Sequence, residues 1–205
     1  MATAPKGLGA QGVRALAGPA HNAPMNPTSA PALTDQATPQ PGLNVVLGGT
    51  GGIGAALVAQ LGACGGAVLA LGRQTQPALD YTAEATVAAC AQHVAQQLAH
   101  TGQRLTRLIV ATGFLHGTTA SGQRAEPERS WQHLNTDALQ HSFLINAIGP
   151  ALVMRHFLPL LPRQGRCVAA FLSARVGSIG DNRLGGWYGY RASKAALNQL
   201  AHSAA

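Results

Sequence analysis

Short apolar runs alternate with longer amphipathic stretches from residue 43 to the end of the chain. Short apolar runs bounded by glycine or polar residues are typical of buried strands, whereas apolar positions spaced by about 3.6 residues indicate helices. The pattern predicts five strands, at 43–47, 67–71, 76–79, 108–111 and 167–172, and the run 76–79 carries the weakest signal. It predicts helices at 53–62, 83–99, 131–161 with a break near Gly149–Pro150, and 189–205.

The alternation of strands and helices predicts an α/β fold with a doubly wound parallel sheet. Parallel strands need crossover connections, and their helices cover both faces of the sheet with a right-handed path. Thr82 is a candidate N-cap for the second helix, and Gly102 is suited to end it. We therefore expect a Rossmann-like domain over residues 43–205.

The first 42 residues differ from this pattern. They contain seven of the twelve prolines, and Lys6, Arg14 and Asp35 are their only charged residues. Proline at this density sustains neither a helix nor a strand ladder, and few residues could form a core. We interpret residues 1–42 as a disordered leader rich in alanine, proline and glycine.

The overall composition narrows the class of protein. Hydrophobic residues make up 46% and charged residues 10%, which favours a folded core. Polar residues interrupt every long apolar run, so no membrane helix is expected. The net charge of +7 raises nucleic-acid binding as a third alternative, but the arginines are scattered and aromatic residues make up only 4%. Three cysteines and eight histidines without ligand spacing predict no metal site and a reducing, cytoplasmic location.

A glycine-rich segment joins the first strand to the first helix. It reads Gly48-Gly49-Thr50-Gly51-Gly52-Ile53-Gly54. Glycine lets the backbone approach a pyrophosphate, and the helix that follows offers free N–H groups and a partial positive charge. No Lys-Ser or Lys-Thr follows, which disfavours a P-loop, and a flexible turn is the alternative. Its place between a strand and a helix favours a dinucleotide site.

The second strand ends at Gly72-Arg73. An acidic residue there would bind the ribose hydroxyl of NAD, whereas an arginine can neutralise the 2′-phosphate of NADP. Arg73 therefore favours NADP(H) over NAD(H), and a solvated surface arginine is the alternative.

Tyr190 and Lys194 form the strongest chemical pattern, at the start of the last helix. Residues four apart lie on one helix face, one turn from each other. Reduction of a carbonyl needs a proton donor, and a nearby ammonium lowers the pKa of a phenol. We interpret the pair as a proton-transfer couple; a solvated helix pair is the alternative.

Together these motifs resemble the short-chain dehydrogenase/reductase family, although Leu47 stands where the family motif begins with threonine. The resemblance implies that Asp80 meets the adenine amino group, unless it only ends a turn. Asn146 matches the family's Asn-x-x-Gly and would hold a water in a proton relay. Ser173 would polarise the carbonyl, with Ser178 as the alternative, because the family's second serine falls on Ala174.

The run 173–198 is similar to the C-factor-like branch and to small carbonyl reductases, as are Phe114-Leu115-His116 and Pro127-Glu128. The segment Val110-Ala111-Thr112-Gly113 replaces the family's Asn-Asn-Ala-Gly, and Gly113 would make room for the cofactor. The cofactor set implied is thus Gly48, Thr50, Gly52, Ile53, Gly54, Arg73, Asp80, Gly113, Tyr190 and Lys194.

The resemblance implies an NAD(P)H-dependent oxidoreductase that interconverts a small carbonyl compound and an alcohol, as a possible homodimer or homotetramer. Family members order their strands 3-2-1-4-5 and continue past the tyrosine–lysine helix with a further strand and a substrate lid. The chain stops at Ala205, so we expect a truncated member. A catalytically weak or silent dinucleotide-binding or signalling protein is the alternative function.

Overall fold

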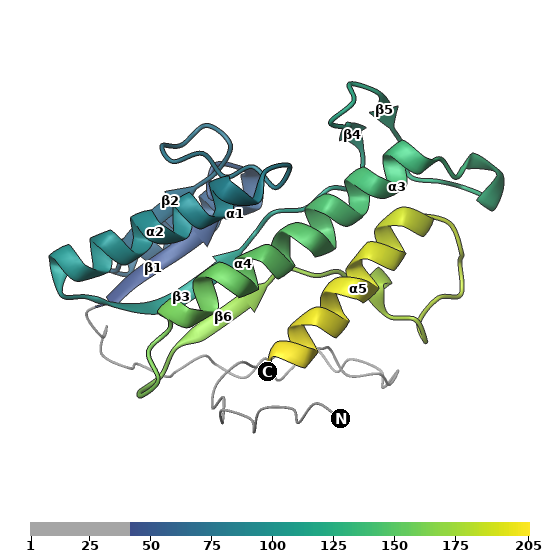
Figure 1. Ribbon diagram of the computed structural model, residues 1–205. Helices are drawn as coiled ribbons and strands as arrows, with labels where there is room; N and C mark the ends of the chain where they lie inside the picture. The colour runs from purple at the N-terminus through teal and green to yellow at the C-terminus, as the bar shows by residue number, and fades with distance from the viewer. Residues whose placement is uncertain (1–41) are drawn as a thin grey trace, which may run out of the picture.

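β1 (Gly42–Leu47) is buried along its whole length and lies inside the sheet. The computed structural model describes residues 42–205, and nearly all of the predicted leader lies outside this range. Parallel neighbours flank β1 on both sides, β2 (Ala67–Leu71) and β3 (Arg104–Val110), and β6 (Val168–Phe171) pairs with β3. The sheet order β2-β1-β3-β6 confirms the predicted parallel sheet (Figure 1).

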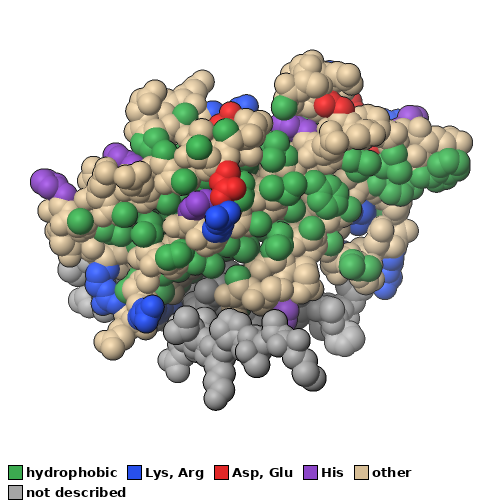
Figure 2. Space-filling view, viewed as in Figure 1, with side chains coloured by type: hydrophobic (Ala, Val, Ile, Leu, Met, Phe, Trp, Pro, Cys, Tyr) green, Lys and Arg blue, Asp and Glu red, His purple; other side chains and the backbone are tan. Residues whose placement is uncertain are grey.

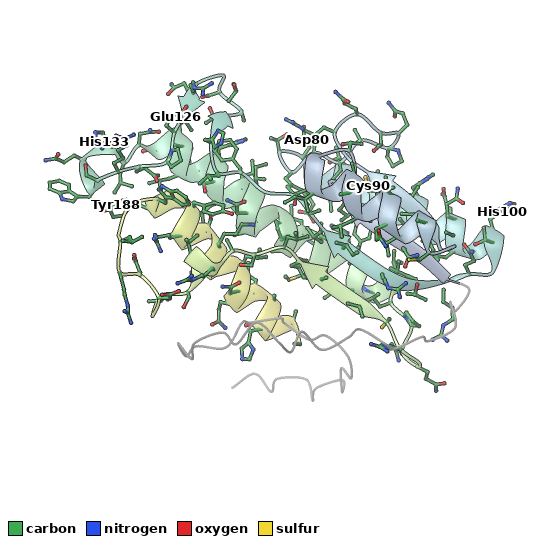
Figure 3. The ribbon with its side chains drawn as sticks, turned by 180° about the vertical axis from the view of Figure 1, so that it is seen from behind. Asp80, Cys90, His100, Glu126, His133 and Tyr188 are labelled. Atoms are coloured by element: carbon green, nitrogen blue, oxygen red, sulfur yellow. The ribbon has the colours of Figure 1, made fainter. Side chains whose placement is uncertain are left out.

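Helices cover both faces of this sheet, as expected for a doubly wound fold. α2 (Glu84–Thr101) and α4 (Gly149–Phe157) lie on one face, and α1 (Gly52–Ala63) lies on the opposite one (Figures 1 and 3). The main core forms between β1, β3, α2 and α4. Its largest fully buried side chains include Leu47, Val87, Leu105, Leu108, Val153 and Phe157. α5 (Tyr188–Ala204) packs against α4 through Leu197 and Met154.

The predicted strand at 76–79 is wrong. Residues 72–79 form a compact loop in which the Thr75 hydroxyl bonds to the carbonyl oxygens of Gly72 and Pro77 at 2.8 and 2.7 Å. The N–H of Leu79 donates to the Gly72 carbonyl at 2.9 Å, which closes the loop on itself. Pro77 has no N–H to give to a ladder, so the apolar residues of this run serve the loop instead.

The start of α2 also differs from the prediction. Thr82 does not cap the helix: Ala83 occupies the cap position and makes no side-chain bond to the helix. The Thr82 backbone N–H and hydroxyl both donate to Asp80 Oδ1, at 2.9 and 2.8 Å. The predicted end is confirmed, because Gly102 adopts the left-handed conformation with φ 66°.

The predicted helix 131–161 consists of several pieces. A 3₁₀ turn (Trp131–His133) precedes α3 (Thr136–Phe143), and a π-helical turn (Leu144–Ile148) connects α3 to α4. A further 3₁₀ turn (Leu158–Leu160) follows. The π-helical turn therefore begins five residues before the expected break at Gly149–Pro150. Such turns are frequent at functional sites.

The run Thr136–Leu160 is 25 residues long and has a mean hydropathy of 1.4. This run is long enough and apolar enough to span a membrane. The sequence analysis expected no membrane helix because polar residues interrupt the run. However, 39% of its most apolar part is buried, and Val153 and Phe157 belong to the core. The core helix of a folded domain has the same composition, so the absence of a membrane partner stays a prediction.

Two features were not predicted. β4 (Gly117–Thr118) and β5 (Arg124–Ala125) form a small antiparallel hairpin, and strands of two residues leave no alternation to detect.

Apolar side chains also gather over α3 and α4 on the surface seen in Figure 2. A shallow, mainly apolar pocket of about 450 Å³ lies there, lined by Leu139, Gln140, Phe143, Leu144 and Ile148.

Candidate nucleotide-binding and catalytic site

The glycine turn between β1 and α1 is tied to the end of β2. The N–H groups of Gly48 and Gly49 both donate to the Leu71 carbonyl, at 2.7 and 3.2 Å. Gly48 adopts φ 80°, which glycine tolerates and other residues resist. A Cβ on Gly54 would collide with the Gly48 backbone. The turn therefore closes so tightly that its shape requires glycine at both positions.

The start of α1 has the properties of an anion site. Gly51 occupies the cap position without a side-chain hydrogen bond, and no acidic residue lies in the first turn. Gly51, Gly52 and Ile53 are exposed, and a Cβ on Gly52 would meet nothing within 4 Å. The first N–H groups of the helix thus face open space, which suits the pyrophosphate of a dinucleotide.

Thr50 of the glycine turn lies next to Gly72, the residue before Arg73. A Cβ on Gly72 would collide with the Thr50 hydroxyl, so the turn packs directly against the residue that precedes Arg73. Arg73 is exposed. Asp80 is also exposed, and its Oδ1 is engaged by Thr82. Arg73 is accordingly placed to meet a group bound at the turn, whereas part of the Asp80 carboxylate stabilises its own loop.

Three predicted residues from distant segments converge beyond β3. A Cβ placed on Gly113 would lie 3.7 Å from both Asn146 Oδ1 and Lys194 Nζ. Gly113 itself is exposed, whereas Asn146 and Lys194 are buried. The fold thereby brings the end of β3, the π-helical turn and α5 to one point.

Asn146 is completely buried and fully hydrogen-bonded. Its Oδ1 accepts from the Phe114 N–H at 2.8 Å, and its Nδ2 donates to the Phe114 carbonyl at 2.7 Å. Nδ2 also contacts the hydroxyls of Ser142 and Ser193, at 3.3 and 3.0 Å. The side chain thus joins the segment after β3 to both helices, and its amide has no exposed polar atom left for a water.

Lys194 is 3% exposed and donates to the Leu172 carbonyl at 2.9 Å. Burial lowers its pKa from 10.5 to about 8, because a charged ammonium loses its hydration there. Nζ lies 5.8 Å from the centroid of the Tyr190 ring. The predicted pair therefore shares one face of α5, with the ammonium near the ring.

Burial raises the pKa of Tyr190, which is opposite to the direction expected from a neighbouring ammonium. Loss of hydration disfavours the phenolate, and Lys194 is directed to Leu172 rather than to the phenol oxygen. The Trp187 ring lies edge-on to Tyr190 at a centroid distance of 6.3 Å. Tyr190 accordingly stays protonated at neutral pH, the form that a proton donor requires.

The Ser173 hydroxyl is hydrogen-bonded to Asn198 on α5. It donates to Asn198 Oδ1 at 2.6 Å, and Asn198 lies eight residues after Tyr190, about 12 Å farther along the helix axis. The next residue, Ala174, has an extended backbone, so its side chain points away from that of Ser173. The alternative, Ser178, is exposed at the end of a 3₁₀ turn (Arg175–Gly177).

Glu128 holds the start of α5 and was noted in the sequence only as part of a family-like segment. It is 7% exposed, and both carboxylate oxygens accept from the Gly189 N–H, at 3.2 and 3.3 Å. Its carbonyl accepts from Trp187 at 2.6 Å. A negative charge at a helix N-terminus stabilises the helix, so Glu128 positions Tyr190 one residue beyond. Only a fold that joins residues 128 and 189 could have revealed this role.

Comparison with known proteins identifies the family. Residues 43–205 match the family model described as short chain dehydrogenase. The chain belongs to the short-chain dehydrogenases. This confirms the resemblance drawn from the glycine turn and the tyrosine–lysine pair, and members of the family are oxidoreductases.

Two curated proteins are similar to parts of the chain. It is 29% identical over 136 residues to 1-hydroxy-2-glutathionyl-2-methyl-3-butene dehydrogenase of Rhodococcus sp. strain AD45, covering 66% of this chain and 53% of that protein. It is 42% identical over 65 residues to C-signal of Myxococcus xanthus, covering 32% and 39%. The chain thus spans about half or less of the length of these curated relatives.

A solved structure of the same family is similar to the chain. A short-chain dehydrogenase/reductase from Burkholderia multivorans with bound NADP superposes with a TM-score of 0.63 at 25% identity, over 80% of this chain and 72% of that one. Within residues 42–205, no group of three or more histidine, cysteine or acidic residues could hold a metal ion.

Proposed function

We propose that this short-chain dehydrogenase is an NADP(H)-dependent oxidoreductase that reduces a small carbonyl compound to an alcohol. The observation that carries the proposal is that Gly113, Asn146 and Lys194 converge next to Tyr190. They lie at the carboxyl edge of the sheet, the edge at which the glycine turn follows β1. Ligands of open α/β sheets bind at this edge.

The residues fit a nicotinamide dinucleotide. The open start of α1 would take the pyrophosphate, and Arg73 beside the Thr50–Gly72 contact would take a 2′-phosphate. The NADP bound to the structural relative supports the phosphorylated cofactor. When bound, the cofactor supplies the hydride.

The chain's own residues would handle the proton. Tyr190, held protonated by burial, would donate to the oxygen of the substrate as the carbonyl is reduced. Lys194, whose pKa of about 8 leaves it mostly protonated at pH 7, would bind the ribose and place a positive charge near the ring. Asn146 would keep the π-helical turn in shape, and a water relay would run through backbone groups rather than its occupied side chain.

The state of Ser173 and the identity of residue 174 favour a second function. Ser173 is engaged by Asn198, and Ala174 offers no hydroxyl to polarise a carbonyl. These two observations, with the similarity to C-signal, support a catalytically weak dinucleotide-binding or signalling protein. The exposed apolar surface over α3 and α4 supports association of copies in either case.

The two functions predict different results for Tyr190→Phe. For an enzyme, the rate of NADPH oxidation with reactive aldehydes should fall by about 10²- to 10⁴-fold, because the proton donor is gone, while NADPH binding stays unchanged. Tyr188→Phe, two residues earlier on the same helix, is the matched control and should retain the rate. NADPH binding without turnover in the unmodified chain would support the signalling function, and equal use of NADH would contradict the role of Arg73.

A further inference from the structure

A second pocket lies beside the start of α5, between this helix and the loop that follows β6. Its volume is about 390 Å³, and it is lined by Arg175, Val176, Asp181, Arg183, Leu184 and Arg191. In Figure 3 the loop that ends at Tyr188 runs along one side of α5. None of these lining residues has a role in the dinucleotide site described above.

Three arginines line this pocket together with a single carboxylate. Arg175 Nε donates to Asp181 Oδ2 at 2.7 Å. The Arg175 guanidinium lowers the pKa of Asp181, and Arg183 and Arg191, which line the same pocket, lower it further. One acidic residue cannot neutralise three permanent positive charges, and the pocket keeps an excess of positive charge.

Arg191 has an unused hydrogen-bond donor. Its Nε donates to the Gly186 carbonyl at 3.0 Å, which fixes the side chain against the loop. Its Nη1 is buried and has no hydrogen-bond partner within residues 42–205. Buried donors without partners are rare in folded proteins because they lose the hydration of the free group. Arg191 also lines the pocket, so the unpaired donor belongs to one of the three cationic side chains around it.

Two of the lining residues, Arg175 and Arg191, are adjacent in sequence to residues of the candidate catalytic site. Arg175 directly follows Ala174, and Arg191 directly follows Tyr190. Neighbouring residues on a helix point about 100° apart, so Arg191 can line the pocket while Tyr190 faces Lys194. The pocket thus borders the two segments that carry Ala174 and Tyr190.

We propose that this pocket is an anion subsite that binds the carboxylate or phosphate group of the carbonyl compound reduced at Tyr190. Guanidinium groups bind both anions through paired N–H donors. The identity of the ligand rests on the proposed function, whereas binding of the anion itself does not.

Isothermal titration calorimetry with succinate, and separately with inorganic phosphate, tests the binding without any turnover. We expect both anions to bind the unmodified chain, and R175Q/R183Q to weaken the binding at least about fivefold through the loss of two charges. R124Q is the matched control, because Arg124 forms an exposed ion pair with Glu126 at the same distance of 2.7 Å. The two probes show whether a carboxylate or a phosphate is preferred.

Asp181→Asn provides a change in the opposite direction. Asp181 occupies Arg175, so its neutralisation should free a donor and tighten anion binding by about threefold. Circular dichroism checks that each variant is folded, and Asp181→Asn decides alone if R175Q/R183Q is unfolded. Absence of binding, or binding that survives R175Q/R183Q, overturns the subsite, since an anion at the glycine turn would be insensitive to these arginines.

Turnover of a matched pair of aldehydes tests the link to the reaction. 4-Oxobutanoate and butanal have the same chain length and differ in one carboxylate. We expect kcat/KM for 4-oxobutanoate to exceed that for butanal, and R175Q/R183Q to reduce this preference about fivefold while butanal stays unchanged. Arginine-dependent succinate binding with no turnover would refute the proposed function alone. Turnover without any dependence on the arginines would refute the subsite alone.

Discussion

The glycine turn after β1 takes its shape from the backbone, whereas the region around Tyr190 depends on hydrogen bonds between side chains of distant segments. In the turn, Gly48 and Gly49 share the Leu71 carbonyl and no side chain caps α1. Around Tyr190, buried Asn146 and Lys194 bond to the Phe114 and Leu172 backbones.

The comparison separates two kinds of sensitivity. A backbone-determined turn is sensitive to an added atom wherever its groups approach too closely for a Cβ, as they do at Gly54. A buried polar network is sensitive to any removed atom, because each lost partner leaves a group without hydration or a hydrogen bond. Enlarging and truncating substitutions should therefore have their largest effects in opposite halves of the site.

The largest effect is expected for Gly54→Ala. Its Cβ would collide with the Gly48 backbone, so the turn must open, and we expect a loss of at least about 3 kcal/mol in the free energy of unfolding. NADPH binding should be lost with it. The control Gly62→Ala lies in the same helix where a Cβ meets nothing within 4 Å, and should gain about 0.5–1 kcal/mol. Urea unfolding measures both, and equal effects would contradict a backbone-determined turn.

Asn146→Ala tests the network from the opposite side. Removal of the Asn146 amide takes away the partners of the half-buried N–H and carbonyl of Phe114, and should cost about 2–4 kcal/mol. Asn182→Ala is the control, because exposed Asn182 makes a single bond to the Gly185 N–H, and its loss should cost less than about 1 kcal/mol. Similar costs for the two variants in urea unfolding would show that the network is not cooperative.

Ala174→Ser adds the hydroxyl that the site lacks. If carbonyl polarisation limits the rate, kcat with reactive aldehydes should rise about tenfold, a part of what one such donor contributes in other enzymes. Ala192→Ser, on the exposed side of α5, introduces the same hydroxyl away from Tyr190 and should leave kcat unchanged. A rate that does not rise would indicate that the substrate oxygen is polarised elsewhere.

The smallest effect concerns the pH dependence of stability. The pKa of Lys194 falls from 10.5 in the unfolded chain to about 8 in the fold. Above pH 8 the folded chain holds the neutral amine while the unfolded chain still takes up a proton, so stability should rise with pH. Relative to Lys194→Met, which cannot titrate, the unmodified chain should gain about 1 kcal/mol between pH 8 and 9. A constant difference in urea unfolding would mean that Lys194 is not desolvated.

Local signals explain why much of the fold and half of the site were predictable. Some signals determine the structure of only a few neighbouring residues. These are the continuous apolar run of β1, the glycines of the turn and Gly102 at the end of α2. The run 76–79 misled the prediction because its apolar residues pack inward from a loop that Thr75 closes. No local rule distinguishes such a loop from a short strand, because both can bury apolar side chains, as the loop does with Leu79.

The sequence alone determined the family, the parallel sheet and the positions of the glycine turn and of the Tyr190–Lys194 pair, since each rests on spacing along one helix or one turn. Only the tertiary structure decided that Ser173 is bound to Asn198, that Glu128 holds the start of α5 and that three arginines line one pocket with Asp181. These contacts join residues on separate segments, and their geometry follows from how strands and helices pack rather than from any neighbour in the chain.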